Sequence, residues 1–407
     1  ELATEVMQLG LKALSGVKVL DLTHYIAGPY CSKLLADFGA DVIKIEQPGG
    51  DPARNMAPFY HDEKHIENSL LFFYLNTSKQ GITLDLKSSE GKGIFRELVM
   101  KSDVVIENFS PRVMPSLGLD FDSLKEIHPS LIMVSISNFG QTGPYRDYKA
   151  TDIVEYALGG LMYIFGGYDR EPLKHAYNQA QFKAGTNAAS ATLIALYHGR
   201  KTNQGQHIDL SIQESVASAL RDVTSNFTYT GAVRRRQPNH SGDLTRLRAV
   251  SDGYILPNPG MSAGLDWNKV VEFLESPSLD DDKFRTGTAR LENAEELGSI
   301  LDKLFSSKTK TDMFYAAHQQ RFIYGVIDSP AEVLANPQNQ YRNRFVEMDH
   351  SFGGQITFPG APFKMSSTPW DGLTPPPLLG QHNKSVLSEM LGYTEDRLKD
   401  LLSDGVI

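Results

Sequence analysis

The first 140 residues alternate short apolar segments with amphipathic ones, and this alternation restricts the folds open to the chain. The segment VKVLDL (17–22) has the composition of a buried strand, and DVIKIE (41–46) is a second one. Between them, AGPYCSKLLADFGA (27–40) places Pro29 in the first turn of a helix and Gly39 at its end. A strand, a helix and a strand in this order build a parallel sheet.

The same pattern then recurs along the chain. Further strands are expected at GITLDL (81–86), DVVIENF (103–109) and LIMVSISNF (131–139), with helices at 88–102 and 121–130 between them. We therefore predict an α/β protein with a doubly wound, Rossmann-like sheet. No GxGxxG follows a strand and no GxxxxGK[ST] occurs, so the dinucleotide and nucleotide-phosphate fingerprints are absent.

A chain of 407 residues exceeds one small core, so a second domain is expected. The composition changes near the polar link RRRQPNHSGD, beyond which charged segments dominate. We predict a large α/β domain at 1–224, a smaller α+β domain at 225–330 and a C-terminal segment at 331–407. The end of the chain, from Thr374, has three consecutive prolines followed by two short amphipathic helices.

Charge and cysteine content narrow the class of protein. The formal net charge is −9, which argues against nucleic acid as a partner, and Arg234–Arg236 is interpreted as a solvated segment. No apolar run reaches the roughly 18 residues that span a membrane. The single cysteine, Cys31, excludes an intrachain disulfide and predicts a cytoplasmic protein. We expect Cys31 to be a small buried residue rather than a reactive thiol.

Signals for metal or serine chemistry are weak. His61 and His65 are four residues apart, but the acids between them stand in the wrong order for a zinc motif and the flanks are polar. No GxSxG motif occurs. We therefore expect no metal site.

Polar residues follow three of the predicted strands. THYIAGPY (23–30) comes after the first, Asn108 stands at the end of the strand at 103–109, and Asn138 and Gln141 stand at and just beyond the end of the strand at 131–139. Ligands of open parallel sheets bind beyond the carboxyl ends of strands. The sequence therefore predicts a crevice there for a large polar ligand.

The stretch NQAQFKAGTNAASATLIALY (178–197) reads as a polar loop that leads into a helix of small and apolar residues. It places Gln181 just before the helix, where unpaired backbone N–H groups favour chemistry.

These segments, in this order, resemble the class III CoA-transferases, the family that includes formyl-CoA transferase, carnitine CoA-transferase and the α-methylacyl-CoA racemases. The resemblance is carried by LSGVKVLDLTHYIAGPYCSKLLADFGADVIKIEQPGGDPAR, by most of 74–144, by GRKTNQGQHIDLSIQES and by PPPLLGQHNKSVLSEMLGY. It covers nearly the whole chain.

The resemblance implies a fold and a ligand. The C-terminal segment would return to the large domain, and two chains would thread through one another as interlocked rings. No cofactor is bound permanently, because a coenzyme A thioester is the substrate. The family's CoA contacts map onto His24, Tyr25, Ile26, Ala27, Leu75, Asn76, Lys79, Asn108 and Phe109.

The resemblance also implies a nucleophile that this chain lacks. Family members use an aspartate four residues before a glycine, and its carboxylate takes the acyl group from the donor thioester. Four residues before Gly185 stands Gln181, whose neutral amide is a very poor nucleophile. Two expected phosphate-binding arginines are also replaced, by Gln47 and Ser116.

Several interpretations are open at this point. In the first, the chain is the non-catalytic subunit of a heteromeric transferase whose paralogous partner carries the aspartate, as in a two-subunit family enzyme of anaerobic aromatic degradation. In the second, another acid, Asp152 or Asp169, serves as the nucleophile in a homodimer. In the third, the aspartate was replaced by design. The acids Asp152 and Asp169 lie outside the nucleophile motif. An α-methylacyl-CoA racemase-like enzyme and a purely structural partner are the alternatives in function.

Overall fold

The computed structural model describes residues 12–238, 242–259, 265–351 and 353–407. The chain divides into two compact units. Unit 1 comprises residues up to 166, 172–235 and 343–407, and unit 2 comprises 167–171 and 236–342. The domain boundaries predicted from composition stay predictions.

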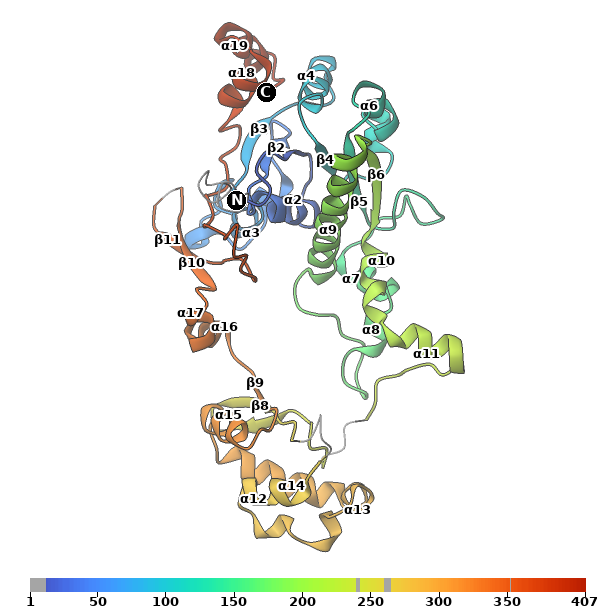
Figure 1. Cartoon of the computed structure of the whole chain (residues 1–407), viewed down its shortest axis with the longest axis vertical. Helices are drawn as coiled ribbons and strands as arrows, with labels where there is room; N and C mark the ends of the chain where they lie inside the picture. The colour runs from blue at the N-terminus through green and yellow to red at the C-terminus, as the bar shows by residue number, and fades with distance from the viewer. Residues whose placement is uncertain (1–11, 239–241, 260–264, 352) are drawn as a thin grey trace. The chain divides into compact units, whose positions relative to one another are not determined.

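Unit 1 is built on a six-stranded parallel sheet (Figure 1). Its strands are β1 (Lys18–Asp21), β2 (Asp41–Glu46), β3 (Gln80–Thr83), β4 (Val104–Glu107), β5 (Ile132–Ser137) and β6 (Gln206–Ser211). Their spatial order is β3-β2-β1-β4-β5-β6. The strand order reverses between β1 and β4, which makes their carboxyl ends the topological switch point. The predicted α/β class with a parallel sheet is confirmed.

Helices cover both faces of this sheet. The first face packs on α2 (Ala27–Ala36), α7 (Asp152–Leu158), α9 (Gln179–Thr202) and α10 (Ile212–Ala217). The second packs on α4 (Ser89–Val99), α5 (Val113–Leu117), α6 (Phe121–Ile127), α18 (Asn383–Leu391) and α19 (Glu395–Ser403). Because strand side chains alternate, Val19 and Leu20 belong to opposite cores.

The small residues of α9 allow it to lie close to α2. A Cβ atom on Gly185 would stand 2.6 Å from the carbonyl oxygen of Ala27, so only glycine fits at this contact. Ala184 and Ala188 are fully buried beside it. This contact brings the start of α9 to the helix that follows β1.

Unit 1 is completed by α3 (Leu70–Leu75), α8 (Leu161–Ile164), α11 (Asp222–Thr230) and an antiparallel hairpin of β10 (Phe345–Asp349) and β11 (Gln355–Pro359). The two predicted C-terminal helices are α18 and α19, and they bury Leu387, Leu398 and Leu401 against the second face. Residues 343–407 thus belong to unit 1.

Unit 2 has a separate hydrophobic core. A three-stranded antiparallel sheet of β7 (Arg248–Val250), β8 (Gly253–Leu256) and β9 (Gly325–Val326) packs with α12 (Trp267–Leu274), α14 (Ala294–Ser306) and α15 (Lys310–Gln319). The remaining helices are α13 (Gly287–Glu292), α16 (Pro330–Ala335) and α17 (Pro337–Tyr341). In neither unit does a described helix combine the length and apolar character needed to cross a bilayer.

Candidate active site

The loop that follows β1 is fixed to the end of β4 at the switch point. The backbone N–H of His24 donates to Asn108 Oδ1 and Asn108 Nδ2 donates to the His24 carbonyl, each at 2.8 Å. The rings of His24 and Phe109 meet edge to face with centroids 5.0 Å apart. Burial lowers the pKa of His24, which favours the neutral ring. Three predicted ligand residues therefore lie together where the sheet favours binding.

Two buried charged residues hold the loop that follows β1 in an unusual backbone conformation. Tyr25 has φ 62° and a side chain that is 49% exposed. Its N–H donates to Asp51 Oδ1 at 3.2 Å, and Lys44 Nζ donates to the Thr23 carbonyl at 2.7 Å. Lys44 and Asp51 form an ion pair of 3.0 Å and are fully buried. Neither residue was predicted from sequence as part of the site.

Lys79, predicted to contact CoA, lies in the interior of unit 1. Its ammonium donates to Asp21 Oδ2 at 2.9 Å, to the Pro29 carbonyl at 3.0 Å and to Asn76 Oδ1 at 2.8 Å. An ammonium has three N–H donors, so all are used. The predicted CoA contacts Leu75 and Asn76 are also fully buried. A phosphate contact from Lys79 requires one of these bonds to break.

The two residues at expected arginine positions offer no charge. Gln47 is exposed and its amide donates to the Gly50 carbonyl at 3.2 Å. Ser116 is exposed and its hydroxyl donates to the Val113 carbonyl at 2.7 Å. Both side chains are neutral and bond to nearby backbone carbonyls, and their place in a phosphate site stays a prediction.

Gln181 lies within the first turn of α9, not before the helix. The expectation of a polar loop there was wrong because α9 begins at Gln179. Asp152 explains the earlier start, since its Oδ1 accepts the N–H of Ala180 at 2.9 Å and that of Gln181 at 3.4 Å. Asp152 also forms a 3.0 Å ion pair with Lys174. This acid caps the helix and is already engaged.

The amide of Gln181 is held by a carboxyl group from α7. Gln181 Nε2 lies 3.1 Å from Glu155 Oε1 and 2.8 Å from Glu155 Oε2. Asn138, with its amide turned so that both ends find partners, donates to Glu155 Oε1 at 3.0 Å and accepts from the Ala150 N–H at 3.0 Å. Burial raises the pKa of Glu155 to about 7, against the hydrogen bond from Gln181, which lowers it.

Sequence reasoning missed Glu155, although a signal was present. Asp152 and Glu155 are three residues apart in an otherwise apolar helix and so share a face. Both acids are buried and need partners, and Gln181 is the partner of Glu155.

Gln141, Asp169 and Cys31 have other surroundings than the Gln181–Glu155 pair. The Gln141 N–H donates to Asp209 Oδ1 at 2.9 Å, and its side chain lines a cavity of about 230 Å³ with Glu107, Ser135 and His207. Asp169 belongs to unit 2. Cys31 is fully buried and burial raises its pKa to about 12, as expected for a packing residue. Across the described residues no cluster of three metal-ligating side chains occurs.

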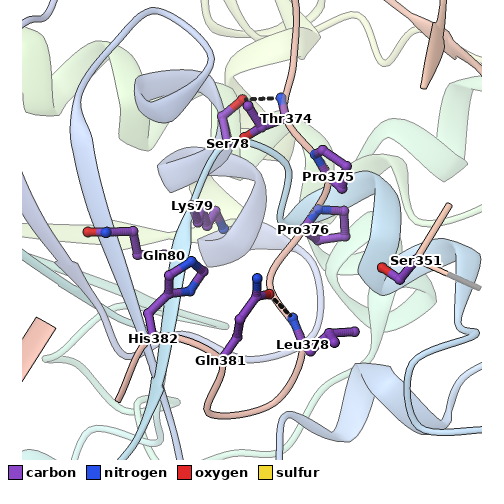
Figure 2. A pocket seen from close by; sticks show the side chains of 10 residues that line it. All are labelled: Ser78, Lys79, Gln80, Ser351, Thr374, Pro375, Pro376, Leu378, Gln381 and His382. Atoms are coloured by element: carbon purple, nitrogen blue, oxygen red, sulfur yellow. Dashed lines mark hydrogen bonds between the residues drawn. The ribbon is translucent and has the colours of Figure 1, made fainter. Parts of the chain in front are cut away.

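A larger cavity, of about 520 Å³, lies beside the start of the edge strand β3 (Figure 2). Its walls come from 78–80 and from the proline segment 374–382. Leu378 N–H donates to Gln381 Oε1 at 2.8 Å and Gly81 N–H donates to His382 Nδ1 at 3.0 Å. The cavity is therefore formed by the packing of the C-terminal segment and is not at the switch point.

A doubly wound parallel sheet with polar residues at its switch point is the architecture of α/β proteins whose ligands lie at strand ends. The chain belongs to CoA-transferase family III, whose family model matches residues 14–383. The family predicted from the sequence is confirmed.

Individual relatives match over nearly their whole length. The human succinyl-CoA:glutarate CoA-transferase is 32% identical over 401 residues, which cover 98% of this chain and 90% of that protein. Subunit BbsE of succinyl-CoA:(R)-benzylsuccinate CoA-transferase from Thauera aromatica is 30% identical over 403 residues, covering 97% and 98%. Among solved structures, a CaiB/BaiF family protein from Brucella suis matches with a TM-score of 0.84 and 30% identity, covering 93% of this chain and 99% of that one.

Proposed function

We propose that this chain is a subunit of a heteromeric class III CoA-transferase that moves CoA from succinyl-CoA to a carboxylic acid, and that it lacks the nucleophilic carboxylate. The observation that carries the proposal is the neutral amide of Gln181, hydrogen-bonded to Glu155 at the start of α9. The paralogous partner subunit would supply the aspartate.

The chemistry explains why an amide does not serve. A carboxylate attacks the thioester carbonyl and expels the CoA thiolate, which leaves a mixed anhydride. The thiolate then attacks the enzyme's acyl carbon, releases the donor acid and leaves an enzyme–CoA thioester, and the acceptor acid reverses these steps. The attacking atom must later leave as a carboxylate oxygen, and the lone pair of an amide nitrogen is delocalised instead.

Glu155 is a poor replacement for the missing acid. Its side chain is fully buried in this chain and accepts hydrogen bonds from Gln181 and from Asn138. A nucleophile must reach the thioester carbon, and burial prevents this. With a pKa of about 7 the carboxyl is also protonated in about half of the molecules at neutral pH.

The donor and the partner are proposed from the relatives and from the surface. Two of the relatives are named for succinyl-CoA, and one is named as a subunit. We propose that this chain serves in an enzyme of the latter kind. Large apolar side chains are exposed on α7, α9 and α11 of unit 1, among them Ile153, Leu158, Ile194, Phe227 and Tyr229. A second chain that covers them, in the interlocked arrangement, would remove this apolar surface from water.

Expression of the chain alone and together with a paralogous family III chain from the same operon tests the proposal. Transfer of CoA from succinyl-CoA to benzylsuccinate, and to a panel of other carboxylic acids, is followed in both preparations. Activity confined to the mixture supports the proposal, and full activity of the chain alone contradicts it.

A pair of matched variants separates the roles of the two subunits. Gln181→Ala in this chain should leave turnover of the mixture nearly unchanged. Replacement of the partner's corresponding aspartate by alanine should abolish it.

A further inference from the structure

Gln181 and Glu155 form one hydrogen-bonded pair that links the first turn of α9 to α7. The amide nitrogen lies within 3.1 Å of both carboxylate oxygens, so the contact engages the whole carboxyl group. A carboxylate accepts hydrogen bonds and has none to donate, so the amide nitrogen is the atom that must face it. When Glu155 is ionised, the pair therefore needs a donor at position 181.

In the part of the chain that the structure describes, Glu155 has neutral hydrogen-bond donors and one acidic neighbour. Among the described residues no lysine or arginine forms an ion pair with Glu155. Asp152, one turn earlier on α7, is its charged neighbour and has its own partner in Lys174. Two neutral amides, Gln181 and Asn138, donate to the carboxyl group. From α10, the amide of Gln213 donates to the Leu158 carbonyl instead.

We propose that Glu155 is a positioning residue whose carboxylate favours a neutral hydrogen-bond donor at position 181. An aspartate can then be re-introduced at position 181 as an ionised nucleophile only when Glu155 is neutralised as well. The inference rests on the proposed function, because it explains why one substitution does not return this chain to the catalytic state. It makes positions 155 and 181 a single unit.

The physical reason is repulsion between like charges at short range. A carboxylate at position 181 would face the buried carboxylate of Glu155 with no cation between them. Two such groups share one proton, as like-charged carboxylates in close contact do. While the pair holds this proton, the carboxyl group at position 181 is a weaker nucleophile. When the proton is lost at higher pH, two buried negative charges remain without a cation between them.

The test is the pH dependence of the melting temperature of the purified chain between pH 5.5 and 8.5. The variants are Gln181→Asp, Gln181→Glu, Glu155→Gln and the double variant Gln181→Asp with Glu155→Gln. Gln179→Asp is the matched control, since it makes the same change at an exposed position in the same turn of α9. The two single acidic variants at 181 should lose roughly 5 °C more than the wild type between pH 6 and 8.

The double variant should lose no more than the wild type over this range, because Glu155 is neutralised, and Gln179→Asp should follow the wild type. If a single variant at 181 does not fold, folding of the double variant supports the proposal and failure of both contradicts it. A Gln181→Asp profile that matches the wild type also overturns it. The measurement needs neither turnover nor the partner, so it is independent of the mixing assay that tests the proposed function.

Discussion

The role expected of Lys79 from the family resemblance differs from its place in the structure. By resemblance it contacts CoA, whereas its ammonium lies buried against Asp21 with all three donors occupied. Replacement by methionine keeps most of the side-chain volume and removes the charge. The variant Lys79→Met therefore separates a structural role from a ligand contact.

The magnitude follows from what the variant leaves behind. Asp21 is fully buried, and although burial by itself raises the pKa of its carboxyl, Lys79 and Lys44 outweigh this and hold it well below the usual range. Removing one partner of a buried ion pair costs about 3–5 kcal/mol. Lys44 and the hydroxyls of Ser32 and Thr23 remain near Asp21, which favours the lower end of this range. The melting temperature should fall by roughly 5–10 °C.

Calorimetry of the purified chain measures this shift, and titration with a CoA thioester measures the ligand role in the same variant. Lys64→Met, at an exposed lysine, is the control and should leave the melting temperature unchanged. Asp21→Asn combined with Lys79→Met should recover part of the loss, because it removes the uncompensated charge. An unchanged melting temperature together with a tenfold weaker affinity for the thioester would refute the structural reasoning.

Three further outcomes are expected from the geometry of unit 1. Gly185→Ala should destabilise the chain by about 1–3 kcal/mol in denaturant unfolding, because its Cβ would force α2 and α9 apart. The control Gly93→Ala, whose Cβ in α4 meets no atom within 4 Å, should stabilise the chain by about 0.5–1 kcal/mol. Equal effects of the two substitutions would contradict the close contact at Gly185. Burial raises the pKa of Glu107 from 4.5 to about 7, so its stabilising contribution is complete below about pH 4.5 and is lost as the pH rises through 7. Glu107→Gln should therefore reduce the fall in unfolding free energy over this pH range by up to about 3 kcal/mol. An unaltered pH profile would show that this carboxyl ionises normally. Asn108→Ala removes both bonds to His24 and should weaken binding of a CoA thioester to the assembled enzyme in calorimetric titration, and undiminished binding would show that the loop is held by other contacts.

The sheet could be predicted from the sequence because its strands are short, apolar and bounded by helix signals. β2 coincides with the predicted 41–46, and β1 lies within 17–22. The order in which the strands lie depends on contacts between distant segments, which local periodicity does not encode. The meeting of Asn108 with the loop after β1 could be anticipated, because Asn108 follows a strand and parallel strands end at one edge.

The details of the site were less accessible for a physical reason. The start of α9 was placed too late because Asp152, which caps it, comes from a helix nearly 30 residues earlier in the chain. The roles of Lys44, Asp51 and Glu155 likewise depend on partners brought together only by folding. A buried charge in a strand or helix is visible in the sequence, but its partner is not.

The central claim is that this chain by itself cannot hold an acyl group covalently, because Gln181 stands where the carboxylate is needed. Incubation of each purified subunit and of the mixture with succinyl-CoA, followed by intact-mass analysis with and without hydroxylamine, tests it most directly. The account predicts that only the partner subunit carries an adduct and that hydroxylamine removes this adduct. A hydroxylamine-sensitive adduct on this chain would contradict it.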